Sequence, residues 1–372
     1  MIPIIKPWLG EEEAQAAAHA VRSGWIAQGP KVAEFEAAFC KATGVAHAIA
    51  VSNCTTGLHL ALIGAGVGPG DDVIVPSLSF IATANCVPYV GANVVFADVD
   101  PVTQNVTAES LAAVWTPKTR AVIAVHQVGM PLDLAPITAL CAERGASLIE
   151  DAACAIGSRY LGQRIGPHSG LVVFSFHPRK VVTTGEGGMI ACQDPAIAAR
   201  LRTLRQHAMS LSDVARHASR TFLFETYDEV GYNYRMTDIQ AAVGLVQLAK
   251  LDAMITTRRA LAARYSELLA ARADLLLPRD PAYGETNFQS YCIKLLDGGR
   301  ARRDALLQSM SDAGVGVKRG IMASHLEKAW ADQPRAPLPE TERWTHESLV
   351  LPLYHTMTAA EQDTVVAALL AG

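Results

Sequence analysis

The sequence predicts an α/β fold built on a mostly parallel seven-stranded sheet, and two features of its pattern support this. Seven short apolar runs are rich in Val and Ile without clean alternation, as is typical of strands buried on both faces. Helix-like segments separate successive runs, as in a parallel sheet covered by helices. The runs occupy residues 46–53, 71–77, 92–98, 120–126, 146–151, 170–176 and 188–193.

The helical pattern changes after the last of these runs. A helix is predicted over residues 195–205, and the polar stretch 206–230 has the length of a functional or interfacial loop. From Thr237 to about Ala271 the sequence predicts one long helix with an apolar stripe. The earlier helical segments, which lie between the strand runs, occupy residues 55–64, 83–89, 108–116 and 134–144.

The C-terminal part of the chain predicts a small α+β unit. Residues 286–296 are a strand candidate, residues 301–314 a helix that ends at a glycine, and residues 359–370 a final helix. We therefore predict a large domain over residues 1–250, whose N-terminal segment can pack on a small domain. The small domain and the long linking helix occupy residues 251–372.

Composition narrows the class of protein. The 372 residues, 50% of them apolar, suffice for a large core, and the net charge of −4 gives no reason to expect nucleic acid or an anionic membrane as a partner. No secretory signal and no apolar run of membrane-spanning length is apparent. The seven cysteines are scattered, without a CxxC pair. These features predict a cytoplasmic protein with reduced thiols and no metal site.

Several polar residues follow the predicted strands directly. In an open parallel sheet, ligands bind beyond the carboxyl ends of the strands. Lys180 follows the strand run 170–176 by a few residues, so we expect it to share one rim of the sheet with several of these groups. The residues at the other strand ends are Asn53, Ser77 to Phe80, Asp98, His126, Asp151 and Ser175 to His177.

The helix that begins near Thr55 is a candidate anion site. Its free N–H groups and positive dipole end suit an anion, and Thr55 and Thr56 add hydroxyl donors. A plain helix N-cap is the alternative, since Ser and Thr favour that position anyway. The nearby GAGVGPG at 64–70 leads from a helix into a strand, which is the reverse of a dinucleotide fingerprint, so it is interpreted as a turn.

Asp151 and Phe80 each allow two interpretations. Asp151 ends an apolar run, where a buried carboxylate needs a positive or hydrogen-bonded partner, but it could also cap the next helix. Asp98 could have that capping role in its own segment. Phe80 could pack in the core, which the sequence alone favours, or offer a flat surface to an aromatic ligand.

Lys180 stands between FSFHP and TTGEGG, where the chain must turn sharply. It could be a surface charge, a phosphate clamp or a nucleophile; near an apolar rim, a lysine can have a lowered pKa and attack carbonyls. The helix start at Thr55, the acid Asp151, the aromatic Phe80 and Lys180 together match the needs of pyridoxal phosphate. These are a phosphate site, a carboxylate for the pyridine nitrogen, a stacking partner and a Schiff-base lysine.

Six ordered motifs resemble those of the nucleotide-sugar aminotransferases known as the DegT or StrS family. The resemblance runs from SGWIAQGP at 23–30 to LVLPLYHTMT at 349–358. It implies a fold-type I aminotransferase whose large domain binds pyridoxal 5'-phosphate, active as a homodimer with shared sites at the interface. The motifs are SNCTTGLHLAL, PSLSFIATAN, HQVGMPLD, EDAACAIGS, FSFHPRKVVTTGEGG and GYNYRMTDIQAAVGLVQL.

The resemblance also implies roles for individual residues. Lys180 would form the Schiff base, and Asp151 would pair with the pyridine nitrogen. Thr55, Thr56 and Ser175 would hold the phosphate, and Phe80 would stack on the ring. Asn233 would reach the phosphate in the neighbouring subunit, and the loop 206–230 would lie near that neighbour's substrate.

The chain departs from the family pattern at three places. Cys54 replaces a common Gly, which leaves backbone donation intact. Cys154 stands where Gln or His often contacts the cofactor's phenolic oxygen, and a thiol is a weak donor, so that contact is in question. The segment 317–330 differs from the aromatic-rich version of many members; we expect it to influence the acceptor, with Arg319 and His325 as candidate contacts and surface charge as the alternative.

The expected reaction is a ping-pong transamination from an amino acid, L-glutamate by resemblance, to a nucleotide-linked keto-deoxyhexose. A related class of enzymes uses a histidine in place of the lysine for sugar deoxygenation, and Lys180 argues against it. A cyclitol or another non-nucleotide ketone remains an alternative acceptor. A non-catalytic regulatory protein that binds the cofactor is the alternative from a different class.

Overall fold

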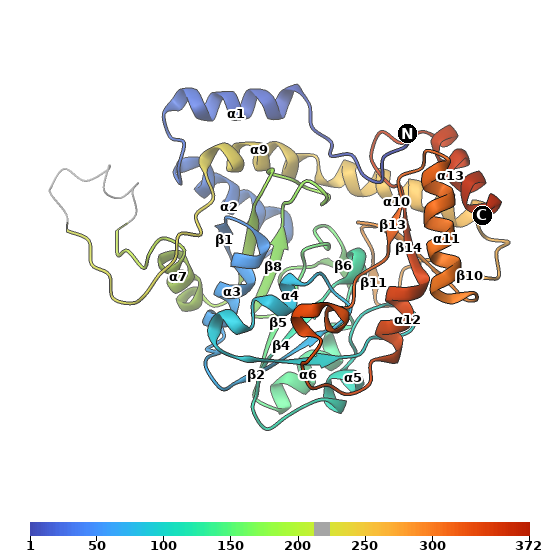
Figure 1. Ribbon diagram of the computed structural model, residues 1–372. Coiled ribbons are helices and arrows are strands. Elements are labelled where there is room, and N and C mark those ends of the chain that lie inside the picture. The colour runs from blue at the N-terminus through green and yellow to red at the C-terminus, as the bar shows by residue number, and fades with distance from the viewer. Residues whose placement is uncertain (212–223) are drawn as a thin grey trace.

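A seven-stranded sheet forms the centre of the molecule in a computed structural model that describes residues 1–211 and 224–372 (Figure 1). Its strand order is β1-β9-β8-β5-β4-β2-β3, and all seven predicted strands are present, which confirms the α/β prediction. The strands are β1 (His47–Val51), β2 (Asp72–Pro76), β3 (Asn93–Ala97), β4 (Thr119–Val125), β5 (Ser147–Asp151), β8 (Leu171–Ser175) and β9 (Gly188–Cys192).

The pairing within this sheet is mostly parallel, as predicted. Strand β9 alone runs against its neighbours, because it pairs antiparallel with both β8 and β1. The other pairs, β3 with β2, β2 with β4, β4 with β5 and β5 with β8, are parallel. The carboxyl ends of β2, β4, β5 and β8 therefore meet at one edge, where ligands bind in sheets of this kind.

Both faces of the sheet are buried, which explains why its strands show no alternation. In β1, Ala48 and Ala50 pack in one apolar cluster, and Ile49 and Val51 pack in the cluster on the opposite face. Figure 1 shows the helices on both sides of the strands. They are α1 (Glu11–Ser23), α2 (Pro30–Thr43), α3 (Cys54–Gly64), α4 (Ala82–Asn85), α5 (Ala108–Ala113), α6 (Leu134–Glu143) and α7 (Pro195–Leu204).

The prediction of one long helix from Thr237 to Ala271 is wrong. The structure has two helices, α9 (Asp238–Ala249) and α10 (Leu251–Leu268), which meet at an angle of 57°. At the bend, the Lys250 N–H donates to Gln247 O rather than four residues back, and Lys250 Nζ is 2.7 Å from both Glu12 and Glu13 on α1. Contacts with α1 thus fix the break.

Within the described ranges, no single helix is long and apolar enough to cross a membrane, although the bent pair α9 and α10 passes that test of length and composition jointly. In the structure, α9 packs against α1 and α2. The predicted division of the chain at residues 250 and 251 coincides with the bend and remains a prediction.

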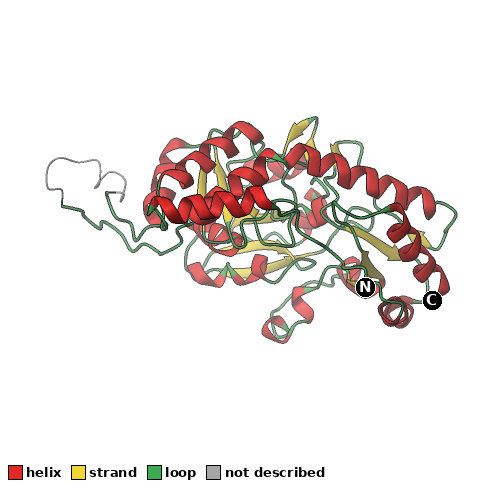
Figure 2. Cartoon of the chain, turned by 90° about the horizontal axis from the view of Figure 1, so that it is seen from above, coloured by secondary structure: helices red, strands yellow, loops and turns green. Residues whose placement is uncertain are grey.

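A second, four-stranded sheet has the order β10-β12-β14-β13 and its own apolar cluster. The chain start lies beside the segment between α11 and β13, since the Ile2 N–H donates to Gly314 O and the Gly316 N–H donates to Ile2 O. Figure 2 shows both termini at this end of the molecule. The elements are β10 (Leu275–Leu276), α11 (Gly299–Asp312), β12 (Tyr291–Leu295), β13 (Lys318–Arg319), α12 (Pro339–Glu347), β14 (Ser348–Leu351) and α13 (Ala359–Ala371).

A small three-stranded sheet, of order β11-β6-β7, completes the described sheets. Its strands are β6 (Arg159–Tyr160), β7 (Gln163–Arg164) and β11 (Gly284–Glu285). Strand β11 comes from the segment between α10 and β12, so this ribbon ties the C-terminal part of the chain to the loop that follows β5.

Candidate active site

Lys180 lies at the carboxyl end of β8, in the turn that leads to β9. Its N–H donates to His177 O at 2.8 Å, which closes the turn, and its half-buried side chain places Nζ 3.1 Å from Cys154 Sγ. Burial lowers the pKa of Lys180, whereas its hydrogen bond to Cys154 and the charge of Asp151 raise it, and the net direction is upward. The expectation of a lowered pKa is therefore wrong for this lysine in the cofactor-free protein.

Asp151 ends β5 and is 5% exposed. Its carboxylate accepts from Thr83 Oγ1 at 2.9 Å and from the Ala153 N–H at 3.1 Å. Burial raises the pKa of Asp151, although both hydrogen bonds and the charge of Lys180 oppose this effect. Within residues 1–211 and 224–372, Asp151 has no ion-pair partner. A cation bound next to this buried carboxylate would therefore stabilise its ionised form.

At the start of α3, Thr56 makes hydrogen bonds within the helix cap, whereas Thr55 does not. Asn53 caps the helix by accepting from the Thr56 N–H at 2.9 Å, and Thr56 Oγ1 donates back to Asn53 O at 2.8 Å. The N-cap is therefore Asn53, and Thr56 completes the capping box as its N3 residue. The Thr55 hydroxyl has no hydrogen-bond partner in the described part of the chain, which leaves it, with the first N–H groups of α3, for an anion.

Gly188, at the start of β9, passes very close to this helix start. A Cβ on Gly188 would lie 2.7 Å from the carbonyl carbon of Asn53 and 2.9 Å from the Cys54 nitrogen. The glycine-rich turn after Lys180 therefore brings the lysine segment and the candidate anion site together at one edge of the sheet.

Phe80 is 70% exposed, so the core interpretation favoured by the sequence is wrong for it. It follows β2, and its neighbour Ser79 is fixed by hydrogen bonds to Met322 O at 3.1 Å and to Thr83 Oγ1 at 2.8 Å. The Phe80 ring is thus an exposed apolar surface at the end of this strand.

Ser175, at the end of β8, is buried, and its hydroxyl accepts from the His177 N–H at 3.5 Å.

Asn233 lies in a segment that packs on α3 of its own chain. Tyr232 and Tyr234 on either side are stacked, with ring centroids 5.0 Å apart, and Tyr234 O accepts from the Ser52 N–H at 2.8 Å. Both tyrosine rings contact His59 on α3, whereas Asn233 is exposed. Residues 212–223 of the expected loop 206–230 lie outside the described residues.

His325 is not available as a surface contact. It is 1% exposed, its Nδ1 lies 2.7 Å from Ser77 Oγ, and its Nε2 lies 3.3 Å from Glu342. Burial lowers the pKa of His325. Neither predicted alternative, substrate contact or surface charge, describes this residue; it fastens the segment 323–326 to the end of β2.

Arg319 is exposed, but it lines a pocket with α11 rather than the rim that holds Lys180. This pocket of about 280 Å³ also includes Arg300, Arg303 and Glu327, and Arg319 Nη2 lies 3.4 Å from Glu327. The neighbouring residue Lys318 is the one whose ammonium lies close enough to Lys180 for the charge of Lys180 to help lower its pKa, after the effect of burial. The sequence interpretation missed Lys318 by one position, which in a strand is the difference between the two faces.

The sequence analysis did not identify Thr83 as a site residue, although it lies in the motif PSLSFIATAN, because nothing in the pattern shows which hydroxyl reaches Asp151.

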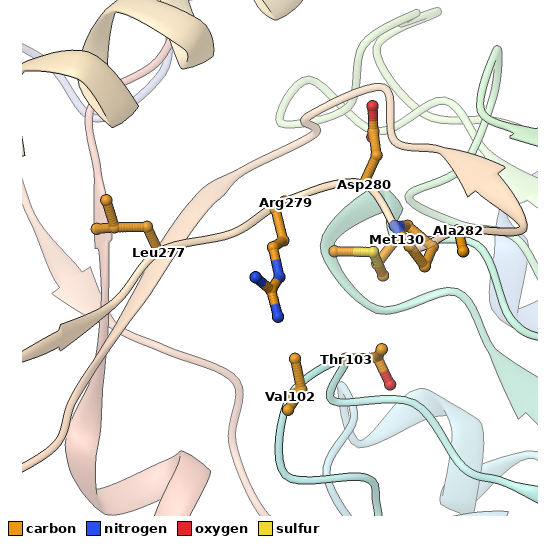
Figure 3. A pocket seen from close by; sticks show the side chains of 8 residues that line it. Val102, Thr103, Met130, Leu277, Arg279, Asp280 and Ala282 are labelled. Atoms are coloured by element: carbon orange, nitrogen blue, oxygen red, sulfur yellow. The ribbon is translucent and has the colours of Figure 1, made fainter. Parts of the chain in front are cut away.

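A further pocket of about 440 Å³ lies away from the candidate site residues (Figure 3). Arg279 points into it toward Val102 and Thr103, while Asp280 points away. The described residues contain no cluster of three or more potential metal ligands.

Solved structures of similar sequence match almost the whole chain. The aminotransferase TlmJ from Streptoalloteichus hindustanus is 36% identical, with a TM-score of 0.92 and coverage of 100% of this chain and 98% of that chain. DesV from S. venezuelae, in complex with a ketimine intermediate, is 32% identical, with a TM-score of 0.90 and coverage of 99% and 97%. The sugar aminotransferase CalS13 from Micromonospora echinospora is 29% identical, with a TM-score of 0.90 and full coverage, 100% of each chain.

The model of the DegT/DnrJ/EryC1/StrS aminotransferase family matches residues 7–370. This range includes every strand of the large sheet and all the candidate site residues. The fold is that of the fold-type I aminotransferases, and the family acts through pyridoxal phosphate. The chain therefore belongs to the DegT/DnrJ/EryC1/StrS aminotransferase family and is a pyridoxal-phosphate-dependent aminotransferase.

Proposed function

We propose that the protein transfers an amino group from L-glutamate to a nucleotide-linked keto-deoxyhexose in two half-reactions at one site. The observation that carries the proposal is that Lys180, after the end of β8, lies at the same edge of the sheet as Asp151, the buried acid without an ion-pair partner at the end of β5. The similarity of the whole chain to the sugar aminotransferase CalS13 supports a sugar acceptor.

The residues of the rim fit pyridoxal phosphate. Asp151 supplies a buried carboxylate for a protonated ring nitrogen, and the start of α3 supplies unpaired N–H groups and the Thr55 hydroxyl for a phosphate. Phe80 offers an exposed aromatic face. Thr56 and Ser175 are expected to support the phosphate site, and the partner's Asn233 to complete it.

Bound at this site, the cofactor supplies an electron sink for the negative charge that develops at the substrate's α carbon. Lys180 would hold the cofactor's aldehyde carbon at rest. With a donor amine bound, Lys180 Nζ is free to take the α proton as a general base and to return it as a general acid. Asp151 would keep the ring nitrogen protonated throughout.

The Cys154 sulfur accepts a hydrogen bond from this lysine. Its Sγ is within hydrogen-bond distance of Lys180 Nζ, and its carbonyl accepts from Asn287 Nδ2 at 2.8 Å, which fixes the loop after β5. We propose that the thiol occupies the place near the cofactor's phenolic oxygen and modulates the proton affinity of Lys180.

The test is an acceptor panel with the purified, cofactor-loaded protein and L-glutamate as donor. The panel contains nucleotide-linked keto-deoxyhexoses, the corresponding free sugars and cyclitol ketones, with product detection by mass spectrometry. We expect an aminated nucleotide sugar and 2-oxoglutarate. Amination of cyclitol ketones alone contradicts the acceptor, and no conversion of any amino donor indicates a non-catalytic protein.

A further inference from the structure

Strand β13 presents its two residues to opposite faces of the small sheet. Lys318 pairs with Val350 on β14, which pairs in turn with Cys292 on β12. Directly paired residues point to the same face of a sheet. Val350 and Cys292 pack in the apolar cluster of the large sheet, so Lys318 also points toward the large sheet.

Arg319 points the other way. It pairs with Leu349, which pairs with Ile293, and both of these residues pack in the separate cluster of the small sheet. This face also carries α11, whose Arg300 and Arg303 line the pocket that contains Arg319. The side chains of Lys318 and Arg319 therefore lie on opposite faces of the small sheet.

The chain around Lys318 is tied to the rim of the large sheet. Just beyond β13, Ser324 N–H donates to Ser77 O at 2.7 Å, and Met322 O accepts from the Ser79 N–H. Ahead of β12, the Gln289 side chain donates to the backbone carbonyl of Arg179, next to Lys180. Both connections bring the Lys318 face of the small sheet against the strand ends that carry Phe80 and Lys180.

The charge balance of this region is positive. Neither Lys318 nor Arg179 has an acidic partner within 4 Å among residues 1–211 and 224–372. Lys318 is exposed in the empty protein, but the protein atoms around its ammonium lower its pKa, and the charges of Lys180 and Arg179 lower it further. Because Lys180 is assigned to the cofactor, Lys318 and Arg179 remain as cations available to a substrate.

We propose that Lys318 binds an oxyanion of a substrate, a carboxylate or phosphate group, and so fixes which substrates this site accepts. The inference rests on the proposed transamination at Lys180, and it assigns to this site substrates that carry negative charge. Lys318 acts by charge and hydrogen bonding from the small sheet, opposite the cofactor groups of the large sheet.

The matched variants are Lys318→Met and Arg319→Met, which remove adjacent cations on opposite faces of one strand. In each variant, loaded with cofactor, the half-reaction with L-glutamate and the reverse half-reaction with aminated nucleotide sugar are followed separately. We expect Lys318→Met to raise the KM of at least one half-reaction about 10- to 100-fold, as for the loss of a charged hydrogen bond. Arg319→Met should leave both unchanged.

Binding of unreactive anions is measured by calorimetry in parallel, with glutarate as the carboxylate probe and inorganic phosphate as the phosphate probe. Weaker glutarate binding in Lys318→Met indicates a carboxylate source, and weaker phosphate binding indicates the acceptor's phosphates. Unchanged KM values and unchanged binding of both probes in Lys318→Met overturn the proposal. If the wild type shows no half-reaction but binds a probe through Lys318, the anion site stands and the proposed function fails.

Discussion

Asp151 shows how a single residue can favour the proposed chemistry at the expense of folding. Its carboxylate is buried, and its partners are a threonine hydroxyl and a backbone N–H rather than a cation. Burial raises its pKa above the ordinary value of 3.8. The folded, cofactor-free protein therefore binds this proton more tightly than the unfolded chain does, and ionisation of Asp151 destabilises the fold.

The variant Asp151→Asn should separate stability from activity. Above pH 3.8 and up to the raised pKa, the cofactor-free wild type loses free energy of unfolding relative to the variant, and the difference is constant at higher pH. Denaturant unfolding of both proteins across this range measures the difference. Transamination by the variant should fall about 10²- to 10³-fold, because the ring nitrogen loses its charge partner.

A flat stability difference between the two proteins across acidic pH would show that Asp151 does not titrate with folding. A variant that retained wild-type turnover would remove Asp151 from the cofactor site. The two outcomes are independent, because the first concerns the empty protein and the second the loaded enzyme.

Cys154 should control how readily Lys180 becomes a nucleophile. The hydrogen bond from Lys180 to the Cys154 sulfur helps to raise the pKa of Lys180, so Cys154→Ala should lower that pKa. Only the unprotonated amine attacks an aldehyde. Covalent loading of the empty protein with pyridoxal phosphate, followed by visible absorbance, should therefore accelerate at a given pH, about tenfold for each unit by which the pKa falls.

The matched control is Cys141→Ala, which removes a buried thiol on α6 that makes no contact with Lys180. Its loading should follow the pH dependence of the wild type. Identical pH profiles for Cys154→Ala and the wild type would mean that the thiol does not influence the lysine.

At the scale of elements, the contact between β9 and the start of α3 determines the geometry of the site. Gly188→Ala should destabilise the protein by about 1–3 kcal/mol, because its Cβ would overlap the backbone at Asn53 and Cys54. It should also weaken cofactor binding, since the first N–H groups of α3 must move. Thermal unfolding and cofactor titration measure the two effects.

Gly170→Ala is the control for the same substitution near the start of β8. A Cβ there meets no atom within 4 Å, so stability should change by less than about 0.5 kcal/mol. Equal effects of the two substitutions would show that the close approach of β9 to α3 does not matter.

The helices and strands also show which features of the fold can be predicted from the sequence. Seven strands buried on both faces leave continuous apolar runs, and these identified the large sheet and the strand ends that carry Asp151 and Lys180. The face on which Lys318 lies depends instead on the register of β13 against β14, which two residues cannot reveal. The bend at Lys250 depends on Glu12 and Glu13, which are distant in sequence.

At the scale of the whole molecule, the described chain leaves Asn233 facing solvent. Tyr232 and Tyr234 pack on His59 of α3, and strand-like alternation directs the intervening Asn233 away from its own chain. An exposed side chain between two anchored rings is well placed to contact a second subunit. The proposed homodimer gives it that role, at the phosphate of the partner's cofactor.

Mixed dimers test this arrangement directly. Lys180→Ala alone should lack covalent cofactor absorbance and turnover, and Asn233→Ala alone should have weakened cofactor binding. When the two variants are unfolded, mixed and refolded together, a hybrid contains one site with an intact Lys180 and the partner's intact Asn233. About a quarter of all sites should then be complete if the chains mix at random. Recovery of activity in the mixture above the sum of the separately refolded variants supports the shared site. If Asn233 acts within its own chain, each hybrid site lacks one of the two residues, and mixing restores nothing.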